Sequence, residues 1–138
     1  MRLSMPQGNT VVLAVLRSPV HRLLSGLALE LRYTGRRSGR EYVLPVQYAR
    51  ASEHLVVRPQ DAQRKSWWRN FKTPGPVTVR LVGRTYHGTA HVLNPEDPGW
   101  EQARLLYVSR WRRLEGRLTG ALVVISLDKQ SPPDRPAP

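Results

Sequence analysis

Apolar and polar residues that alternate with a period of two constrain the fold of this chain most. Leu29, Leu31 and Tyr33 alternate with polar residues in the segment 27–34, as expected of a strand that buries one face. The same reading predicts five more strands, over residues 42–48, 54–58, 77–82, 84–92 and 121–127. The segment 35–40 is expected to be a turn, and Gly83 the centre of a hairpin turn. Pro45 lies inside a predicted strand and requires a sheet edge or a bulge there, because proline has no amide hydrogen.

Helical patterns separate these strands at three places. Apolar residues at helical spacing predict two N-terminal pieces, over 10–17 and 19–25. A short aromatic helix is predicted over 65–72, and a longer one, capped by Asn94 and Pro95, over about 96–115. Six antiparallel strands with helices packed outside predict a mainly β fold with helices (α+β), a small barrel or half-barrel.

The length of 138 residues fits one domain, which we expect to span residues 1–130. Four prolines in the last eight residues predict a disordered tail over 131–138. The longest apolar run near the start, over 11–16, is shorter than the roughly 20 residues of a spanning helix and the roughly 7–15 of a secretory core. The cytoplasm is therefore the expected location.

Charge indicates an anionic partner. The chain has 22 Lys+Arg against 10 Asp+Glu, a net charge of +12, which favours a phosphorylated cofactor, an acidic membrane surface or nucleic acid. An arginine-rich codon usage would give the same excess. The N-terminal apolar residues with Arg17 and Arg22 could lie on the inner face of an anionic membrane, although docking on the barrel is the simpler expectation.

Composition also excludes several kinds of chemistry. The absence of cysteine excludes disulfides, thiolate metal sites, iron–sulfur clusters and cysteine nucleophiles. The four histidines lack the HExxH spacing of a zinc hydrolase, so no metal site is expected.

The turn over 35–40 is the most informative segment, since it combines two glycines, three arginines and a serine. Glycines allow positive φ and can aim successive amides at one anion, while arginine adds forked, charged donors for phosphate or carboxylate oxygens. The alternative is an ordinary hairpin turn with a solvated basic tip. No GK[ST] follows the turn, so it is not a P-loop.

Two aromatic clusters lie further along the chain. In residues 64–72 we expect Trp67 and Phe71 to pack in the core, and Trp68 with the basic flanks to face a ligand. Tyr107 and Trp111 have the same spacing, and packing on the barrel is expected of them rather than a lid. Basic and aromatic residues that alternate could also indicate a nucleic-acid-binding module, but arginines are spread along the chain and no nucleic-acid partner is expected.

Two segments in this order, LRSPVHRLLSGLALELRYTGRRSGREYVLPVQY and RKSWWRNFKTPGPVTVRLVGRTYHGTA, resemble the deazaflavin-dependent nitroreductase and quinone reductase family over residues 12–127. The resemblance implies an FMN-binding-like split β-barrel. It also implies reduced coenzyme F-420 as hydride donor to a small electron-poor acceptor, a quinone or a nitro compound. The TGRRSG turn would hold the phosphate and acidic tail of the coenzyme, and a proline of the next strand would lie against its ring. These assignments fall on Gly35, Arg36, Arg37, Ser38, Gly39 and Pro45.

The sequence departs from the family pattern at two places. Arg58 begins a segment that differs from the Ser-Lys-Gly-Gly-like one of relatives, and Tyr42 stands where they often carry a basic residue. Phosphate binding would then be shared with Arg58, Arg64 and Lys65, or the coenzyme would differ, with FMN as second choice.

The chemistry requires little of the protein itself, because the coenzyme carries the hydride. A proton donor near the acceptor would assist. Tyr48 and Tyr107 are the best candidates, although a purely structural role is the simpler expectation for both. A split barrel that binds a flavin-like or lipid ligand without catalysis is the alternative function.

Overall fold

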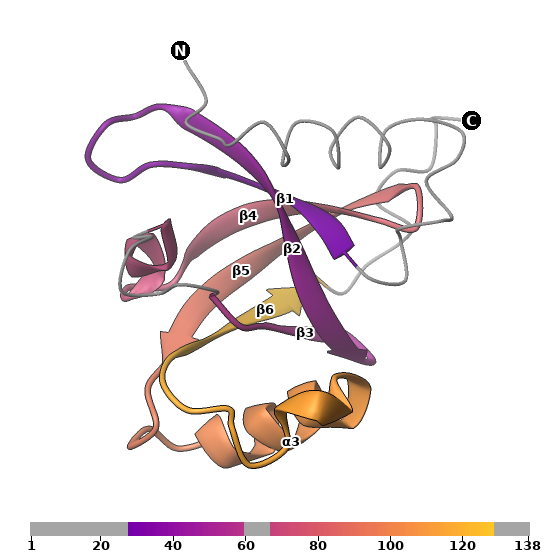
Figure 1. The fold of residues 1–138 in the computed structure, drawn as a ribbon. Helices are drawn as coiled ribbons and strands as arrows, with labels where there is room; N and C mark the ends of the chain where they lie inside the picture. The colour runs from indigo at the N-terminus through magenta and orange to yellow at the C-terminus, as the bar shows by residue number, and fades with distance from the viewer. Residues whose placement is uncertain (1–27, 60–66, 129–138) are drawn as a thin grey trace. The chain divides into compact units, whose positions relative to one another are not determined.

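The computed structural model describes residues 28–59 and 67–128. Its strands are β1 (Ala28–Thr34), β2 (Glu41–Ala51), β3 (His54–Val57), β4 (Gly75–Leu81), β5 (Arg84–Leu93) and β6 (Leu122–Leu127) (Figure 1). They form a closed barrel in the order β1-β2-β3-β6-β5-β4. The helical elements are η1 (Trp67–Phe71) and η2 (Arg112–Leu114), both 3-10, and the α-helix α3 (Trp100–Arg110). The predicted mainly β fold with six antiparallel strands is confirmed.

The chain divides into two compact units. Unit 1 comprises Met1–Gln47, Pro76–Gly88 and Asp128–Pro138, and unit 2 comprises Tyr48–Gly75 and Thr89–Leu127. The single domain expected over 1–130 stays a prediction. The helical pieces predicted over 10–17 and 19–25 and the tail predicted over 131–138 lie outside the described residues.

In unit 1, β1 lies between β2 and β4. Leu31 is opposite Leu44 of β2 on one side and Val79 of β4 on the other, and both Leu31 and Val79 are fully buried. The alternation of β1 therefore fills a core, as predicted. Val82 and Gly83 join β4 to β5, both with positive φ (50° and 76°), which is the geometry of a tight hairpin turn.

Pro45 lies within β2, opposite Glu30 of β1. The pairing of β2 with β3 covers Tyr48–Ala51, and Pro45 precedes it. The missing amide hydrogen therefore removes no bond from that ladder, which is how β2 accommodates a proline.

In unit 2, β3 pairs with the end of β2 and with β6, and α3 packs against β3 and β6 (Figure 1). The core under α3 consists of Ala49, Val56, Ala103, Tyr107, Val108, Leu118, Leu122 and Val124. None of the helices in the described ranges combines the length and the apolar character that crossing a membrane requires.

The predicted start of the long helix near residue 96 is wrong. The Asn94 amide donates to Asp97 Oδ2 at 2.8 Å, and the Asp97 amide donates to the Asn94 carbonyl at 2.8 Å, so these residues form a closed turn. Gly99 follows with a φ of 90°, and α3 begins only after it. At the other end, Trp111 leaves the helix with a φ of −117°.

The predicted helix over 65–72 is also corrected, because the described part of it is the 3-10 helix η1. The Lys72 amide donates to the Arg69 carbonyl at 3.2 Å, a bond over three residues instead of four. Pro74 lies two residues after Lys72 and cannot continue a helix, so η1 ends before it.

Candidate functional site

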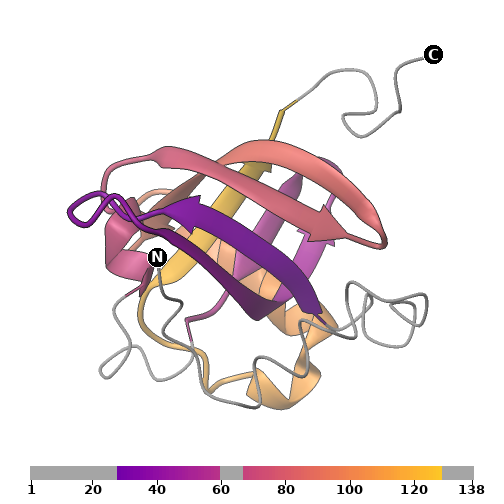
Figure 2. The ribbon, with the colours of Figure 1, turned by 90° about the horizontal axis from the view of Figure 1, so that it is seen from above.

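Residues 35–40 form the turn that joins β1 to β2 (Figure 2). Hydrogen bonds within the turn close it. The Gly35 amide donates to the Arg40 carbonyl at 2.7 Å, and the Gly39 amide donates to the Gly35 carbonyl at 3.0 Å. The Arg40 amide donates to Ser38 Oγ at 3.1 Å. The amides of both glycines thus close the turn, whereas the sequence predicted amides that face an anion. We call residues 35–40 the arginine turn.

Each glycine of the arginine turn is required for a different reason. Gly39 has a φ of +70°, a conformation that residues with a Cβ rarely adopt. A Cβ on Gly35 would lie 2.8 Å from Ser38 Oγ and 2.9 Å from Tyr42 Cε2, closer than packed atoms allow. Both glycines therefore shape the turn that presents the arginines.

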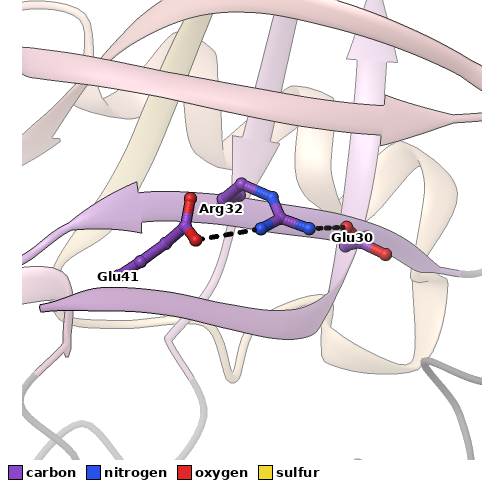
Figure 3. A network of polar contacts seen from close by, with 3 residues as sticks. All are labelled: Glu30, Arg32 and Glu41. Carbon is purple, nitrogen blue, oxygen red and sulfur yellow. Dashed lines mark hydrogen bonds and ion pairs between the residues drawn. The ribbon is translucent and has the colours of Figure 1, made fainter. Parts of the chain in front are cut away.

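The arginine turn keeps a positive surface. All three of its arginines are exposed. Glu41, the next residue, has its carboxylate Oε1 3.2 Å from Arg32 Nη1, and Arg32 Nη2 also contacts Glu30 Oε2 at 3.3 Å (Figure 3). The carboxylate nearest the turn is therefore paired with an arginine of β1.

Sequence reasoning missed the burial of Glu30. Its position in the alternation of β1 predicts a polar, exposed side, yet Glu30 is only 5% exposed, and half-buried Pro45 lies opposite it. One signal in the sequence could have indicated this burial. Arg32 lies two residues after Glu30, on the same face of the strand, and its opposite charge can pair with the carboxylate.

In unit 2, Trp111 connects the two tyrosines predicted as proton donors. The rings of Tyr107 and Trp111 stack, with 6.2 Å between their centroids and 30° between their planes. Trp111 Nε1 donates to the backbone carbonyl of Tyr48 at 3.0 Å. The i, i+4 spacing predicted the first contact, whereas nothing in the sequence indicated the second. We call Tyr48, Tyr107 and Trp111 the tyrosine cluster.

The hydroxyl of Tyr107 is buried, and it has no hydrogen-bond partner among the described residues. Burial raises the pKa of Tyr107 to about 12, although the nearby charges of Arg58 and Arg113 lower it. Burial also raises the pKa of Tyr48, against the charges of Arg50 and Arg110. Both phenols therefore keep their protons at neutral pH and can donate a hydrogen bond.

Arginines surround the tyrosine cluster. Arg58 follows β3 directly and is half-buried, and it is close enough to Tyr107 to affect its pKa. The guanidinium carbon of Arg110 lies 4.4 Å from the centroid of the Trp111 ring, a cation–π contact. The cluster thus combines phenol donors with positive charge.

The aromatic segment 67–71 follows its predicted division in part. Phe71 is fully buried, as predicted, whereas Trp67 is only half-buried. The two rings make an edge-type contact, with their centroids 6.4 Å apart. Trp68 is also half-buried, with the guanidinium carbon of Arg69 5.4 Å from its ring centroid. Arg64 and Lys65, predicted to contact the coenzyme, lie outside the described residues.

Comparison with known proteins gives one family match and several similar structures. The family described as F-420H(2)-dependent quinone reductase matches residues 13–123. No curated protein matches the chain. The F-420-H2-dependent reductase FDR-A is 20% identical with a TM-score of 0.56, and the match covers 70% of this chain and 92% of that one.

Two further solved structures have other printed roles. HutZ, the heme storage protein from Vibrio cholerae, is 15% identical with a TM-score of 0.56, over 83% of this chain and 92% of that one. A FAD-binding protein from Mesorhizobium loti is 20% identical with a TM-score of 0.50, over 78% of this chain and 83% of that one. At these identities the likeness shows the fold alone, and it confirms the predicted split β-barrel.

Proposed function

The chain belongs to the F-420H2-dependent quinone reductase family, and we propose that it binds reduced coenzyme F-420 and reduces a small electron-poor acceptor with it. The acceptor class is a quinone or a nitro compound.

The donor set of the arginine turn fits the anionic end of this coenzyme, and this observation carries the proposal. Exposed guanidinium groups suit phosphate and carboxylate oxygens, and the carboxylate beside the turn is engaged by Arg32. Arg36 and Arg37 would contact the phosphate and the acidic tail. Gly35 and Gly39 give the turn the shape that presents them, and Ser38 accepts the Arg40 amide.

Bound coenzyme would supply the hydride, and the residues of the chain would orient the reactants and provide a proton. We assign the donor role to Tyr107, with Tyr48 as its neighbour in the tyrosine cluster. The buried hydroxyl of Tyr107 lacks a partner among the described residues, and it stays protonated at neutral pH. In this role the Tyr107 hydroxyl would donate a hydrogen bond to an oxygen of the acceptor. It would then supply the proton that this oxygen takes up on reduction.

Other predicted contacts of the coenzyme complete the proposal. Pro45 would lie against the ring system, and Arg58 and Trp68 would add charge and aromatic surface. Arg64 and Lys65 would supplement the phosphate contacts. FMN remains the second choice of coenzyme.

Titration of the purified protein with F-420 and, separately, with FMN tests the coenzyme, with binding followed by absorbance or fluorescence. We expect tighter binding of F-420, and oxidation of its reduced form when a soluble quinone or a nitroaromatic compound is added. Equal or tighter binding of FMN would overturn the choice of coenzyme. Binding of F-420 without turnover of either acceptor would identify a non-catalytic binder.

A further inference from the structure

We propose that Tyr42 is a positioning residue that holds the arginine turn in the conformation that binds the coenzyme. The inference rests on the proposed function, because it assigns the turn to coenzyme binding. Tyr42 is the second residue of β2, two positions after the end of the turn, and its side chain is half-buried.

The hydroxyl of Tyr42 contacts the centre of the arginine turn. It lies 3.3 Å from Ser38 Oγ, and the same Ser38 Oγ accepts the amide of Arg40 at 3.1 Å. Ser38 is thus held from two directions, by the backbone of the turn and by a side chain of β2. Loss of the phenol hydroxyl would leave only the backbone contact.

The ring of Tyr42 contacts the start of the turn as well. Its Cε2 lies 2.9 Å from the position that a Cβ on Gly35 would occupy. The ring therefore packs closely against the backbone at Gly35, while its hydroxyl reaches Ser38. One side chain contacts two separate points of a six-residue turn.

Tyr42 is itself fixed by the core. Its ring stacks on that of Tyr33, with centroids 5.4 Å apart and planes at 23°, and the two residues are directly opposite in the register of β1 and β2. Tyr33 is only 7% exposed. Stacking on a buried ring restricts Tyr42 to one orientation, and Tyr42 in turn restricts the arginine turn.

The consequence for binding is preorganisation. An exposed turn with two glycines would otherwise have to be ordered when the coenzyme binds, and that ordering would weaken the affinity. A turn that Tyr42 already holds presents its arginines before the coenzyme arrives.

The test compares Tyr42→Phe, which removes the hydroxyl only, with Tyr42→Leu, which also removes the stacked ring. The first measurement is the affinity for F-420 at fixed salt concentration, and the second is hydrogen exchange of the Gly39 and Arg40 amides by NMR. Tyr86→Phe is the matched control, because Tyr86 is also half-buried but belongs to β5. We expect Tyr42→Phe to lower affinity about three- to ten-fold, Tyr42→Leu to lower it further, and Tyr86→Phe to change nothing.

Exchange separates positioning from a general structural role. We expect the Gly39 and Arg40 amides to exchange faster in both Tyr42 variants, while amides of the β4–β5 hairpin and the melting temperature change little. Unchanged affinity and unchanged turn exchange in both variants would overturn the proposal, as would faster exchange throughout the protein. If the wild type does not bind F-420, the proposed function fails, and exchange at the turn alone decides whether Tyr42 holds it.

Discussion

Replacement of Tyr107 by phenylalanine is expected to raise stability and lower activity together. The ring of Tyr107 is fully buried and stacks on Trp111, and phenylalanine keeps that ring. The hydroxyl has no hydrogen-bond partner among the described residues. The substitution therefore removes one unsatisfied polar group and little else.

The magnitude follows from the cost of such a group. A buried polar group without a partner destabilises the folded state by about 1–3 kcal/mol. We expect Tyr107→Phe to recover about 1 kcal/mol or more of that, less the small cavity that the lost oxygen leaves. For a chain of this size the melting temperature should rise by about 3–5 °C for each kcal/mol.

Activity is expected to change in the opposite direction. A positioned proton donor contributes on the order of 10²–10⁴-fold to a rate, so kcat for quinone reduction should fall by at least about 100-fold while coenzyme affinity changes little. Urea unfolding and steady-state kinetics on the same preparation provide both values, with Tyr86→Phe as the control for loss of a tyrosine hydroxyl.

Two results would refute parts of this reasoning. A lower free energy of unfolding in Tyr107→Phe would mean that the hydroxyl has a partner in the folded protein. Higher stability with unchanged kcat would mean that the hydroxyl lacks a partner in the folded protein but that Tyr107 is not the proton donor.

Three further predictions concern stability. Burial raises the pKa of Tyr33 and Tyr107 from the ordinary 10.0 to about 12, so the folded state holds these protons more tightly than the unfolded state. The contribution of these two tyrosines to the free energy of unfolding should be fully present below about pH 10 and should be lost as the pH rises from 10 through 12. Urea unfolding at a series of pH values measures this, and a free energy that does not change over that range would contradict it. Val82→Asn should stabilise the protein by about 0.5–1 kcal/mol, because Val82 is exposed at a φ of 50°, a conformation that asparagine adopts more readily than a β-branched residue. An unchanged or lower melting temperature of this variant would contradict the prediction. Arg32→Met should destabilise the protein by about 1.5–3 kcal/mol, because it removes a charged partner of the buried Glu30. The control Arg117→Met, at an exposed residue, should change stability by less than about 0.5 kcal/mol. Equal effects of the two variants in chemical unfolding would contradict this prediction.

The fold was predictable where local pattern and turn chemistry agree. The period-two alternation of Leu29, Leu31 and Tyr33 defines β1, and Gly83 defines the hairpin, because side chains that alternate and a glycine at positive φ act within a few residues. The start of α3 was not predictable in this way. Asn94 has the side chain of a helix cap, but Asp97 bonds its backbone in a separate turn.

The candidate site shows the same division. The composition of the arginine turn predicted either an anion-binding nest or a solvated basic tip, and in the structure its three arginines are exposed. The direction of its amides depends on Ser38, whose oxygen accepts the Arg40 amide. The contact of Trp111 with Tyr48 joins residues 63 positions apart, and the burial of Glu30 depends on the tertiary structure around β1. Contacts of this kind are set by packing and not by local sequence.

The role of the arginine turn in coenzyme binding is tested most directly by one titration, F-420 against the wild type and Arg37→Ala at low and high salt. Arg37 is exposed on the turn, so its loss should leave stability within about 0.5 kcal/mol. A lost charged hydrogen bond of about 1.5–3 kcal/mol predicts affinity about 10- to 100-fold weaker, and salt should weaken the wild type more than the variant. Unchanged affinity in a folded Arg37→Ala protein, with the same salt dependence as the wild type, would contradict the assignment of this turn to the coenzyme.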